Sequence, residues 1–301
     1  MDRSITKEAA ISTPSLRASL ELLKPVTWFA PMWAYGCGIV SSGVSITDLW
    51  WTLLAGIALC GPLVCGTSQA CNDWYDRHVD AINEPHRPIP SGRIPGQWGL
   101  YIALAWSALS LLVALSLGAW VFYATIVGLA AAWAYSAPPF RLKINGWFGN
   151  GAVGLCYEGL PWFTAAAAML AGRPPEEVII LALLYSVGAH GIMTLNDFKA
   201  VEGDRMMGIG SLPVKLGEAN AALLACVVMA IPQVIVAGLL LHWQRPLYAA
   251  IVAASVALQI LCMLRLVKDP KKFAPWYNGT GVTLYVLGML AAAIAIRGGL
   301  R

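Results

Sequence analysis

Residues 53–71 read "LLAGIALCGPLVCGTSQAC", and they run directly into "NDWYDRHVD" at residues 72–80. The first stretch has no charged side chain, and about 20 apolar residues are enough for a helix to cross a bilayer. The second stretch places acids and bases at the end of that helix, where burial without partners costs free energy. This junction predicts a transmembrane helix that ends in a polar cluster with a function.

The composition extends this interpretation to the whole chain. Of the 301 residues, 58% are hydrophobic and only 12% are charged, against about 25% in a soluble domain. The apolar runs are long and continuous, unlike the alternating segments of about ten residues in a membrane barrel. We expect an all-α integral membrane protein with nine transmembrane helices. The predicted spans are 24–42, 49–71, 98–117, 120–138, 148–170, 177–196, 219–241, 246–267 and 280–298.

Residues 1–23 form a separate N-terminal segment in this scheme. They mix charged and polar residues and lack the short apolar core of a cleaved signal peptide. Thr13 is expected to cap a short interfacial helix with Pro14 at its first position, and Leu16, Leu20 and Leu23 follow one face of it. The seven cysteines lie singly in or beside apolar spans, which predicts packed thiols.

The basic residues indicate the orientation. If the N-terminus is cytoplasmic, nine spans place sixteen of the twenty Lys and Arg residues on the cytoplasmic side and four outside. The N-terminus and the acidic stretch at 72–80 are therefore predicted to face the cytoplasm. The net charge of +4 follows from this bias, and no basic stripe with interleaved aromatics indicates a nucleic-acid partner.

The acidic stretch forms a stripe if it is helical. At about 100° per residue, Asp73, Asp76 and Asp80 fall within about 60° of one another. Three unpaired carboxylates would repel one another, so the stripe predicts a bound cation that prefers hard oxygen ligands. No His or Cys cluster accompanies it, which argues against zinc.

A second acidic stretch, "NDFKAVEGD" at residues 196–204, also follows an apolar span. Asp197 and Asp204 repeat the spacing of Asp73 and Asp80, and an Asn precedes each motif, but Ala200 replaces the middle acid. Lys199 is expected to point away from the acidic face if the helix continues past Asp197. The two stretches resemble matching halves of one site.

A diphosphate bridged by Mg²⁺ would suit two facing acidic motifs. Mg²⁺ takes few protein carboxylates and completes its shell with water and substrate phosphates. Nearby cations would neutralise the other phosphate oxygens, although the orientation bias alone also explains their presence. The candidate cations are Arg87, Arg141, Lys143, Arg205 and Lys215.

Three stretches together carry a resemblance to a known family: "NDWYDRHVDAINEPHRPIPSGRI", "YSAPPFRLK" and "NDFKAVEGDRMMGIGSLPVKLG". The chain resembles the UbiA-type intramembrane prenyltransferases over nearly its whole length after about residue 15. The second acidic motif, which lacks its middle acid, narrows the resemblance to the chlorophyll and bacteriochlorophyll synthases, and to the bacteriochlorophyll branch most closely.

The resemblance implies a nine-helix bundle at 24–301 that forms one prenyltransferase domain. It implies Mg²⁺-dependent transfer of a geranylgeranyl or phytyl group from its diphosphate to the propionate of a bacteriochlorophyllide, in a bacterial inner or photosynthetic membrane. Ala200 leaves the number of metal ions open. The residues implied to bind Mg²⁺ and the prenyl diphosphate are Asn72, Asp73, Asp76, Asp80, Asn196, Asp197 and Asp204.

The expected chemistry agrees with the residues present. A carboxylate acceptor is already ionised at neutral pH, so the absence of an obvious Ser/His/Asp triad is expected. Tyr135 and Arg141, near the end of a span, are predicted to lie by the diphosphate or the prenyl group, or else to act as an interfacial anchor and a topology signal. Glu158 and His190 lie within predicted spans, and we weigh a tetrapyrrole contact against a hydrogen bond between the two.

Other functions stay open at this point. Within the family, the acceptor could be a chlorophyllide, an aromatic acid, a quinone precursor or haem. A cation-coupled transporter is a more distant alternative, since its acids would lie nearer the bilayer midplane. No sequence feature indicates association with other pigment-synthesis enzymes or with insertion machinery.

Overall fold

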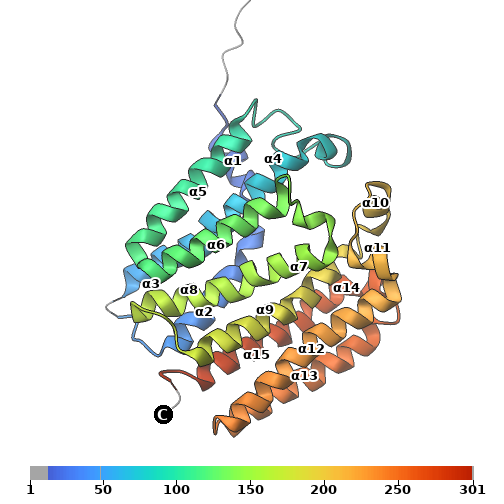
Figure 1. Cartoon of the computed structure of the whole chain (residues 1–301). Coiled ribbons are helices and arrows are strands. Elements are labelled where there is room, and N and C mark those ends of the chain that lie inside the picture. The colour runs from blue at the N-terminus through green and yellow to red at the C-terminus, as the bar shows by residue number, and fades with distance from the viewer. Residues whose placement is uncertain (1–12, 48, 300–301) are drawn as a thin grey trace, which may run out of the picture.

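The computed structural model describes residues 13–47 and 49–299. Three basic residues of the orientation count, Arg3, Lys7 and Arg301, lie outside the described residues, as does the first half of the predicted N-terminal segment. The described part is helical, without a β-strand (Figure 1). The predicted all-α class is confirmed.

The N-terminal half contains α1 to α6 and two irregular helical turns. In chain order these elements are α1 (Leu16–Leu22), the 3₁₀ turn η1 (Pro25–Trp28), α2 (Phe29–Ser42), α3 (Trp50–Ala58), the π-helical turn η2 (Leu59–Cys65), α4 (Gly66–Asn83), α5 (Trp98–Leu117) and α6 (Ala119–Ser136).

The remaining elements begin with the short turn before α7. They are the 3₁₀ turn η3 (Leu142–Ile144), α7 (Gly146–Gly154), the π-helical turn η4 (Leu155–Gly159), α8 (Leu160–Leu170), α9 (Glu176–Asp197), α10 (Val201–Met206), α11 (Leu212–Leu216), α12 (Glu218–His242), α13 (Pro246–Leu266), α14 (Pro270–Gly279) and α15 (Gly281–Ala295).

Seven helices of the described chain are long and apolar enough to cross a membrane. The other two predicted spans, 24–42 and 148–170, are helical but irregular. α2 has 14 residues, which at about 1.5 Å per residue is shorter than the hydrocarbon core, and a π-helical turn interrupts the second span between α7 and α8. The count of nine therefore stays a prediction.

The N-terminal helix begins two residues later than the sequence predicts. Ser15 is the N-cap, and its hydroxyl accepts a hydrogen bond from the backbone N–H of Ala18 at 3.2 Å. Thr13 and Pro14 precede the helix, so the predicted cap is wrong. Leu16 and Leu20 are exposed on one face, as an interfacial helix requires, whereas Leu23 is buried.

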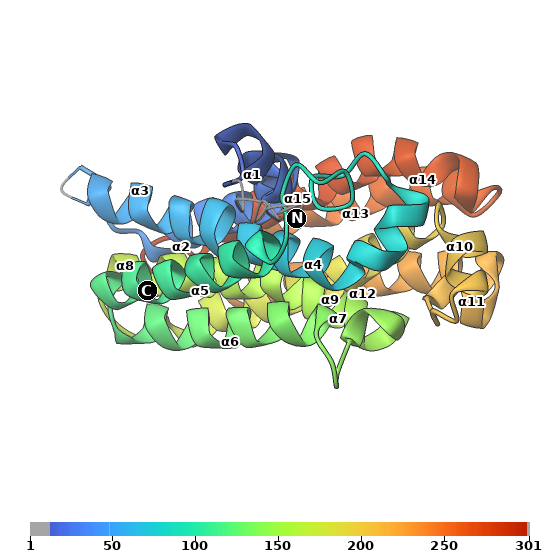
Figure 2. The ribbon, with the colours of Figure 1, turned by 90° about the horizontal axis from the view of Figure 1, so that it is seen from above.

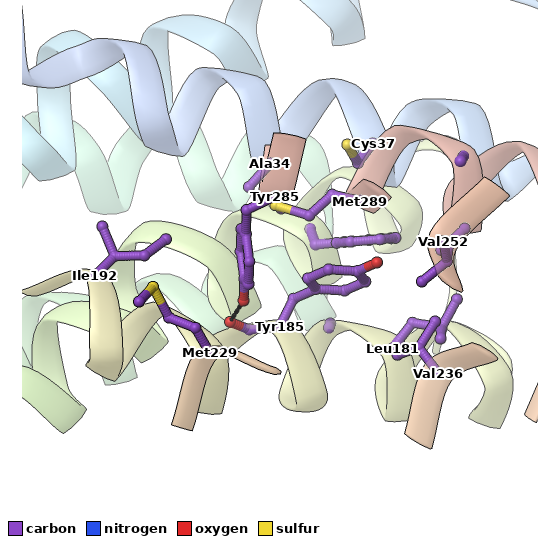
Figure 3. Packing of buried hydrophobic residues seen from close by; sticks show 14 of the residues in the cluster. Ala34, Cys37, Leu181, Tyr185, Ile192, Met229, Val236, Val252, Tyr285 and Met289 are labelled. Atoms are coloured by element: carbon purple, nitrogen blue, oxygen red, sulfur yellow. Dashed lines mark hydrogen bonds between the residues drawn. The ribbon is translucent and has the colours of Figure 1, made fainter. Parts of the chain in front are cut away.

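The long helices pack side by side, with α5 and α6 on one flank and α12 and α13 on the other (Figure 1; Figure 2 shows the bundle from above). Between the flanks, Tyr285 of α15 donates a hydrogen bond to the backbone oxygen of Tyr185 of α9 at 2.5 Å (Figure 3). Gly188 makes this approach possible, because a Cβ there would lie 2.2 Å from the Tyr285 hydroxyl. The core thus fixes α9, which carries the second motif.

The basic loops gather at one end of the bundle. Arg93, between α4 and α5, pairs with Glu21 of α1, and Lys271 of α14 pairs with Glu202 of α10. The segment before α7 exchanges backbone hydrogen bonds with Gly210 before α11. These contacts join the loops that the orientation count assigns to one side. The side of the membrane that this end faces stays a prediction.

Candidate functional site

A cavity of about 960 Å³ lies between the two acidic motifs. Its wall includes side chains from η1, α2, α4, α6, α7, η4, α9, α14 and α15. Apolar residues such as Phe29 and Met193 form part of it. The polar residues of interest in the wall are Asn72, Tyr135, Asn150, Asn196, Asp197 and Lys199. The fold thus brings Asn72 of the first motif and Asn196 and Asp197 of the second, distant in sequence, to one cavity. The other predicted acids, Asp73, Asp76, Asp80 and Asp204, do not line it.

The first motif is helical throughout, as the predicted stripe requires, because α4 extends to Asn83. Asp73 and Asp80 are both buried. The Arg87 guanidinium lies 3.3 Å from Asp73 and 2.8 Å from Asp80, and the Lys24 ammonium lies 2.7 Å from Asp73. Burial lowers the pKa of Arg87, but attraction to the two carboxylates outweighs this and raises the pKa above its ordinary value.

The third acid of the stripe has its own cation. Lys143, between α6 and α7, donates to one oxygen of Asp76, and Asn72 donates to the other at 3.1 Å. Asn72 also donates to the Ser136 hydroxyl at 3.3 Å. Three basic side chains from three separate segments therefore balance the three acids of the stripe. The charge argument for a bound cation is weaker than the sequence indicates, because protein cations already provide the compensation.

The second motif is built differently. α9 ends at Asp197, a turn follows, and Asp204 lies in the short helix α10. The amide of Asn150 donates to Asp197 at 3.1 Å and to the Thr194 hydroxyl at 3.2 Å. Asp204 is buried, which raises the pKa of its carboxyl. Among the described residues, neither Asp197 nor Asp204 forms an ion pair.

Close packing of α7 on α9 explains the position of Asn150. A Cβ at Gly154 would lie 2.6 Å from the backbone oxygen of Ser186, so only glycine permits this approach. Asn150 lies one helical turn before Gly154 and therefore meets the C-terminal turn of α9. Asn150 is not among the residues predicted from the sequence, where its one signal is a lone amide in a glycine-rich segment.

The structure also brings two further lysines to the site. Lys24 was counted only as a topology residue, yet it contacts Asp73. Lys199 is expected to point away from the acidic face only if the helix continues past Asp197. This condition is not met, because α9 ends at Asp197, one residue beyond the predicted span, and Lys199 lines the cavity from the turn that follows.

The predicted diphosphate ligands divide into two groups. Arg87 and Lys143 contact the first motif, and Tyr135 lines the cavity. The other three are exposed, are not in the cavity wall, and form no ion pair with a described residue, so their role stays a prediction. They are Arg141, Arg205 and Lys215.

The predicted tetrapyrrole contacts lie apart from the cavity. Glu158 is buried in η4, and its Oε2 atom has no hydrogen-bond partner among the described residues. His190 lines a second, apolar groove of about 670 Å³ beside Trp147, which shares no lining residue with the cavity. No hydrogen bond joins Glu158 to His190 within the described chain. The role of both stays a prediction.

The donor set at the cavity fits Mg²⁺. The candidate ligands are carboxylate and amide oxygens, the hard donors that Mg²⁺ prefers, and Asp73 has one buried oxygen without a hydrogen-bond partner in the described chain. Within the described ranges, no three His, Cys, Asp or Glu residues are grouped closely enough to enclose an ion. This suits a metal that takes one or two carboxylates and is completed by phosphates and water.

Comparisons with known proteins agree with this geometry. Residues 25–280 match the UbiA prenyltransferase family. The bacteriochlorophyll synthase 33 kDa chain of Cereibacter sphaeroides is 60% identical over 95% of each chain. The chloroplastic chlorophyll synthase of Arabidopsis thaliana is 40% identical over 96% of this chain and 77% of its own.

Among solved structures, a UbiA homolog from Archaeoglobus fulgidus bound to GPP and Mg²⁺ has the same fold. Its TM-score is 0.71 at 20% identity, over 93% of this chain and 99% of that chain. The family match and the close relatives agree over nearly the whole sequence. The chain therefore belongs to the UbiA prenyltransferase family, and it is an enzyme that transfers prenyl groups.

Proposed function

We infer that this protein transfers a geranylgeranyl or phytyl group from its diphosphate to the propionate carboxylate of a bacteriochlorophyllide, forming bacteriochlorophyll. One observation carries this inference: Asn72 of the first motif and Asn196 and Asp197 of the second line a single large cavity. The acceptor follows from the relatives, since identity is 60% to a bacteriochlorophyll synthase and 40% to a chlorophyll synthase.

The reaction exchanges one C–O bond for another. A carboxylate oxygen of the acceptor bonds to the first carbon of the prenyl group, and the bond from that carbon to the diphosphate breaks with its electron pair. The carboxylate is ionised at neutral pH, so no proton is transferred. Bound Mg²⁺ would stabilise the negative charge that develops on the departing diphosphate.

The two motifs hold the diphosphate in this proposal. Asn72, Asp73, Asp76 and Asp80 provide oxygen ligands for Mg²⁺ on the α4 side, and Asn196, Asp197 and Asp204 provide them on the α9 side. Lys24, Arg87 and Lys143 then exchange some of their contacts with the carboxylates for contacts with phosphate oxygens. The support is that each of these cations already lies against a carboxylate of the first motif.

The apolar part of the cavity wall suits a reaction that must exclude water. Apolar side chains from η1, α2, α9 and α15 line the cavity beside the polar ones, among them Val26, Ile192 and Val282. An allylic cation would react with water if the site were open to solvent. A wall of this kind also suits a prenyl tail and an apolar macrocycle.

We propose one transmembrane domain at 24–301, preceded by an N-terminal interfacial segment at 1–23, in a bacterial photosynthetic membrane with the cavity facing the cytoplasm. The clustering of the basic loops at one end of the bundle supports this orientation. Cysteine accessibility from either side of sealed membrane vesicles tests it. Labelling of the exposed Arg141→Cys variant from the periplasmic side would contradict it.

A direct assay tests the reaction. Purified full-length protein is mixed with Mg²⁺, geranylgeranyl diphosphate and bacteriochlorophyllide a, and the ester is separated by chromatography. We expect the geranylgeranyl ester to form only when all three are present. Parallel reactions use phytyl diphosphate, chlorophyllide a and 4-hydroxybenzoate. No ester from bacteriochlorophyllide in any lipid or detergent, with product from 4-hydroxybenzoate, would overturn the acceptor assignment.

A further inference from the structure

The proposed reaction places two anions in one cavity, and this raises a question about charge. The diphosphate has Mg²⁺ and the cations around the first motif. The acceptor's propionate needs a separate partner, because like charges held close together repel each other strongly in a medium of low dielectric constant. This inference rests on the proposed function and identifies the side chain that recognises the acceptor.

The cations of the first motif are not available for this role. Lys24, Arg87 and Lys143 each contact an aspartate of α4. None of these three lies in the cavity wall. Lys199 is the one basic side chain in the wall of this cavity within the described residues.

Lys199 owes this position to the turn after α9. The neighbouring Phe198 is fully buried and anchors the turn, while Lys199 itself is exposed at the cavity. Lys199 lies in the turn that follows the end of α9 at Asp197, and it lines the cavity from there.

Lys199 forms no ion pair within the described residues, although its charge attracts the nearby Asp197 carboxylate. No carboxylate of residues 13–47 or 49–299 lies within ion-pair distance of its ammonium, although Asp197 is two residues away in sequence. The rest of the wall is mixed. Asn196, Asp197 and Asn278 are polar, whereas Met193, Val282 and Phe29 are apolar and come from α9, α15 and α2. A single cation in a partly apolar cavity suits a large apolar molecule that carries one carboxylate.

We propose that Lys199 binds the propionate of the tetrapyrrole acceptor and holds it beside the prenyl diphosphate. The ammonium contacts one carboxylate oxygen and leaves the other with lone pairs free to attack the prenyl carbon. No proton moves to or from Lys199 in this step. The contact also makes the enzyme selective for acceptors with a free carboxylate over those with a phenol.

The test compares two pigments in two proteins. Bacteriochlorophyllide a and the methyl ester of its propionate are titrated into full-length protein in nanodiscs, and binding is followed by pigment absorbance. The wild type should bind the free acid more tightly than the ester. A charge-assisted hydrogen bond implies a preference of about 10- to 100-fold.

The variants locate that preference. Lys199→Met should bind the two pigments equally and show a higher KM for the acceptor with an unchanged KM for the prenyl diphosphate. Lys199→Arg should keep most of the preference, because the charge remains. Lys268→Met is the matched control, since Lys268 is an exposed lysine at the same end of the bundle and is not in the cavity wall, and it should behave as wild type.

Two results would overturn the inference while leaving the proposed function intact. One is a Lys199→Met variant that keeps the wild-type preference for the free acid. The other is a variant whose defect lies in the KM for the prenyl diphosphate, which would assign Lys199 to the donor. If the wild type makes no ester and binds neither pigment, the proposed function fails and the inference fails with it.

Discussion

The two acidic motifs look alike in sequence but differ in their electrostatics. In the α4 motif, each aspartate contacts a basic side chain, and the contacts come from three different segments. In the second motif, Asp197 has only the amide of Asn150, and Asp204 is buried without an ion pair in the described chain. We conclude that the first half is charge-balanced without metal, whereas the second half gains more from a bound cation.

Removing Mg²⁺ tests this difference with the largest expected effect. Chelation with EDTA should abolish ester formation, because the departing diphosphate loses its stabilisation. It should change the unfolding temperature of the substrate-free protein little, because Mg²⁺ completes its shell with the phosphates of the substrate and the protein's own cations balance the first motif. Adding Mg²⁺ back should restore activity, and a large drop in unfolding temperature with EDTA would show that the metal is a structural component.

Replacing single aspartates comes next. Asp73→Asn and Asp197→Asn keep the side-chain shape but remove the charge, and each should lower turnover by at least about 100-fold. The measurement is ester formation per amount of folded protein. The Mg²⁺ concentration for half-maximal rate should rise for any residual activity. Near-normal turnover in either variant would show that its carboxylate is not a ligand.

Replacing Asn150 tests the hydrogen bond that supports Asp197 in the second motif, and a smaller effect is expected. Asn150→Ala removes the donor to Asp197 and should lower turnover by about 10-fold, since supporting contacts to ligands typically have effects of 10- to 100-fold. The variant Asn150→Asp should be worse, because it places a second carboxylate beside Asp197. Ser136→Ala, which loses only a contact to Asn72, is the milder comparison. Equal activity of Asn150→Asp and wild type would contradict this role.

Replacing a basic partner of the first motif tests its charge balance through the free energy of unfolding. Arg87→Met leaves two buried carboxylates short of a partner, and we expect a loss of about 1–3 kcal/mol, below the usual cost of a fully buried pair because Arg87 is partly exposed. Arg93→Met breaks an exposed pair with Glu21 and should cost less than Arg87→Met, because solvent screens an exposed pair. Chemical unfolding in detergent measures both, and a larger loss for Arg93→Met would reverse the argument.

Much of the fold could be predicted because the apolar runs of the sequence are long. A helix in lipid must satisfy its own backbone hydrogen bonds, so a long uncharged run predicts a helix with little ambiguity. The prediction was weakest at 24–42 and 148–170. There, α2 is short and a π-helical turn that contains Glu158 interrupts the other span, features that hydropathy alone does not reveal.

The acidic residues of the site could be predicted from the sequence, but the side chains that contact them could be predicted less well. Asp73, Asp76 and Asp80 could be placed on one face because α4 is regular across the whole motif. Lys24 and Asn150 were missed because each reaches its aspartate across a distance of about 50 residues in sequence, which no local pattern encodes.

The sequence by itself determined a helical membrane protein with two related acidic motifs, because hydropathy and helical period act locally. Only the tertiary structure decided which charges meet. The packing of α7 on α9 through Gly154 depends on contacts between distant segments, and so do the positions of Lys24, Arg87 and Lys143 at α4. Electrostatic energy depends on distance in space, and the fold sets that distance.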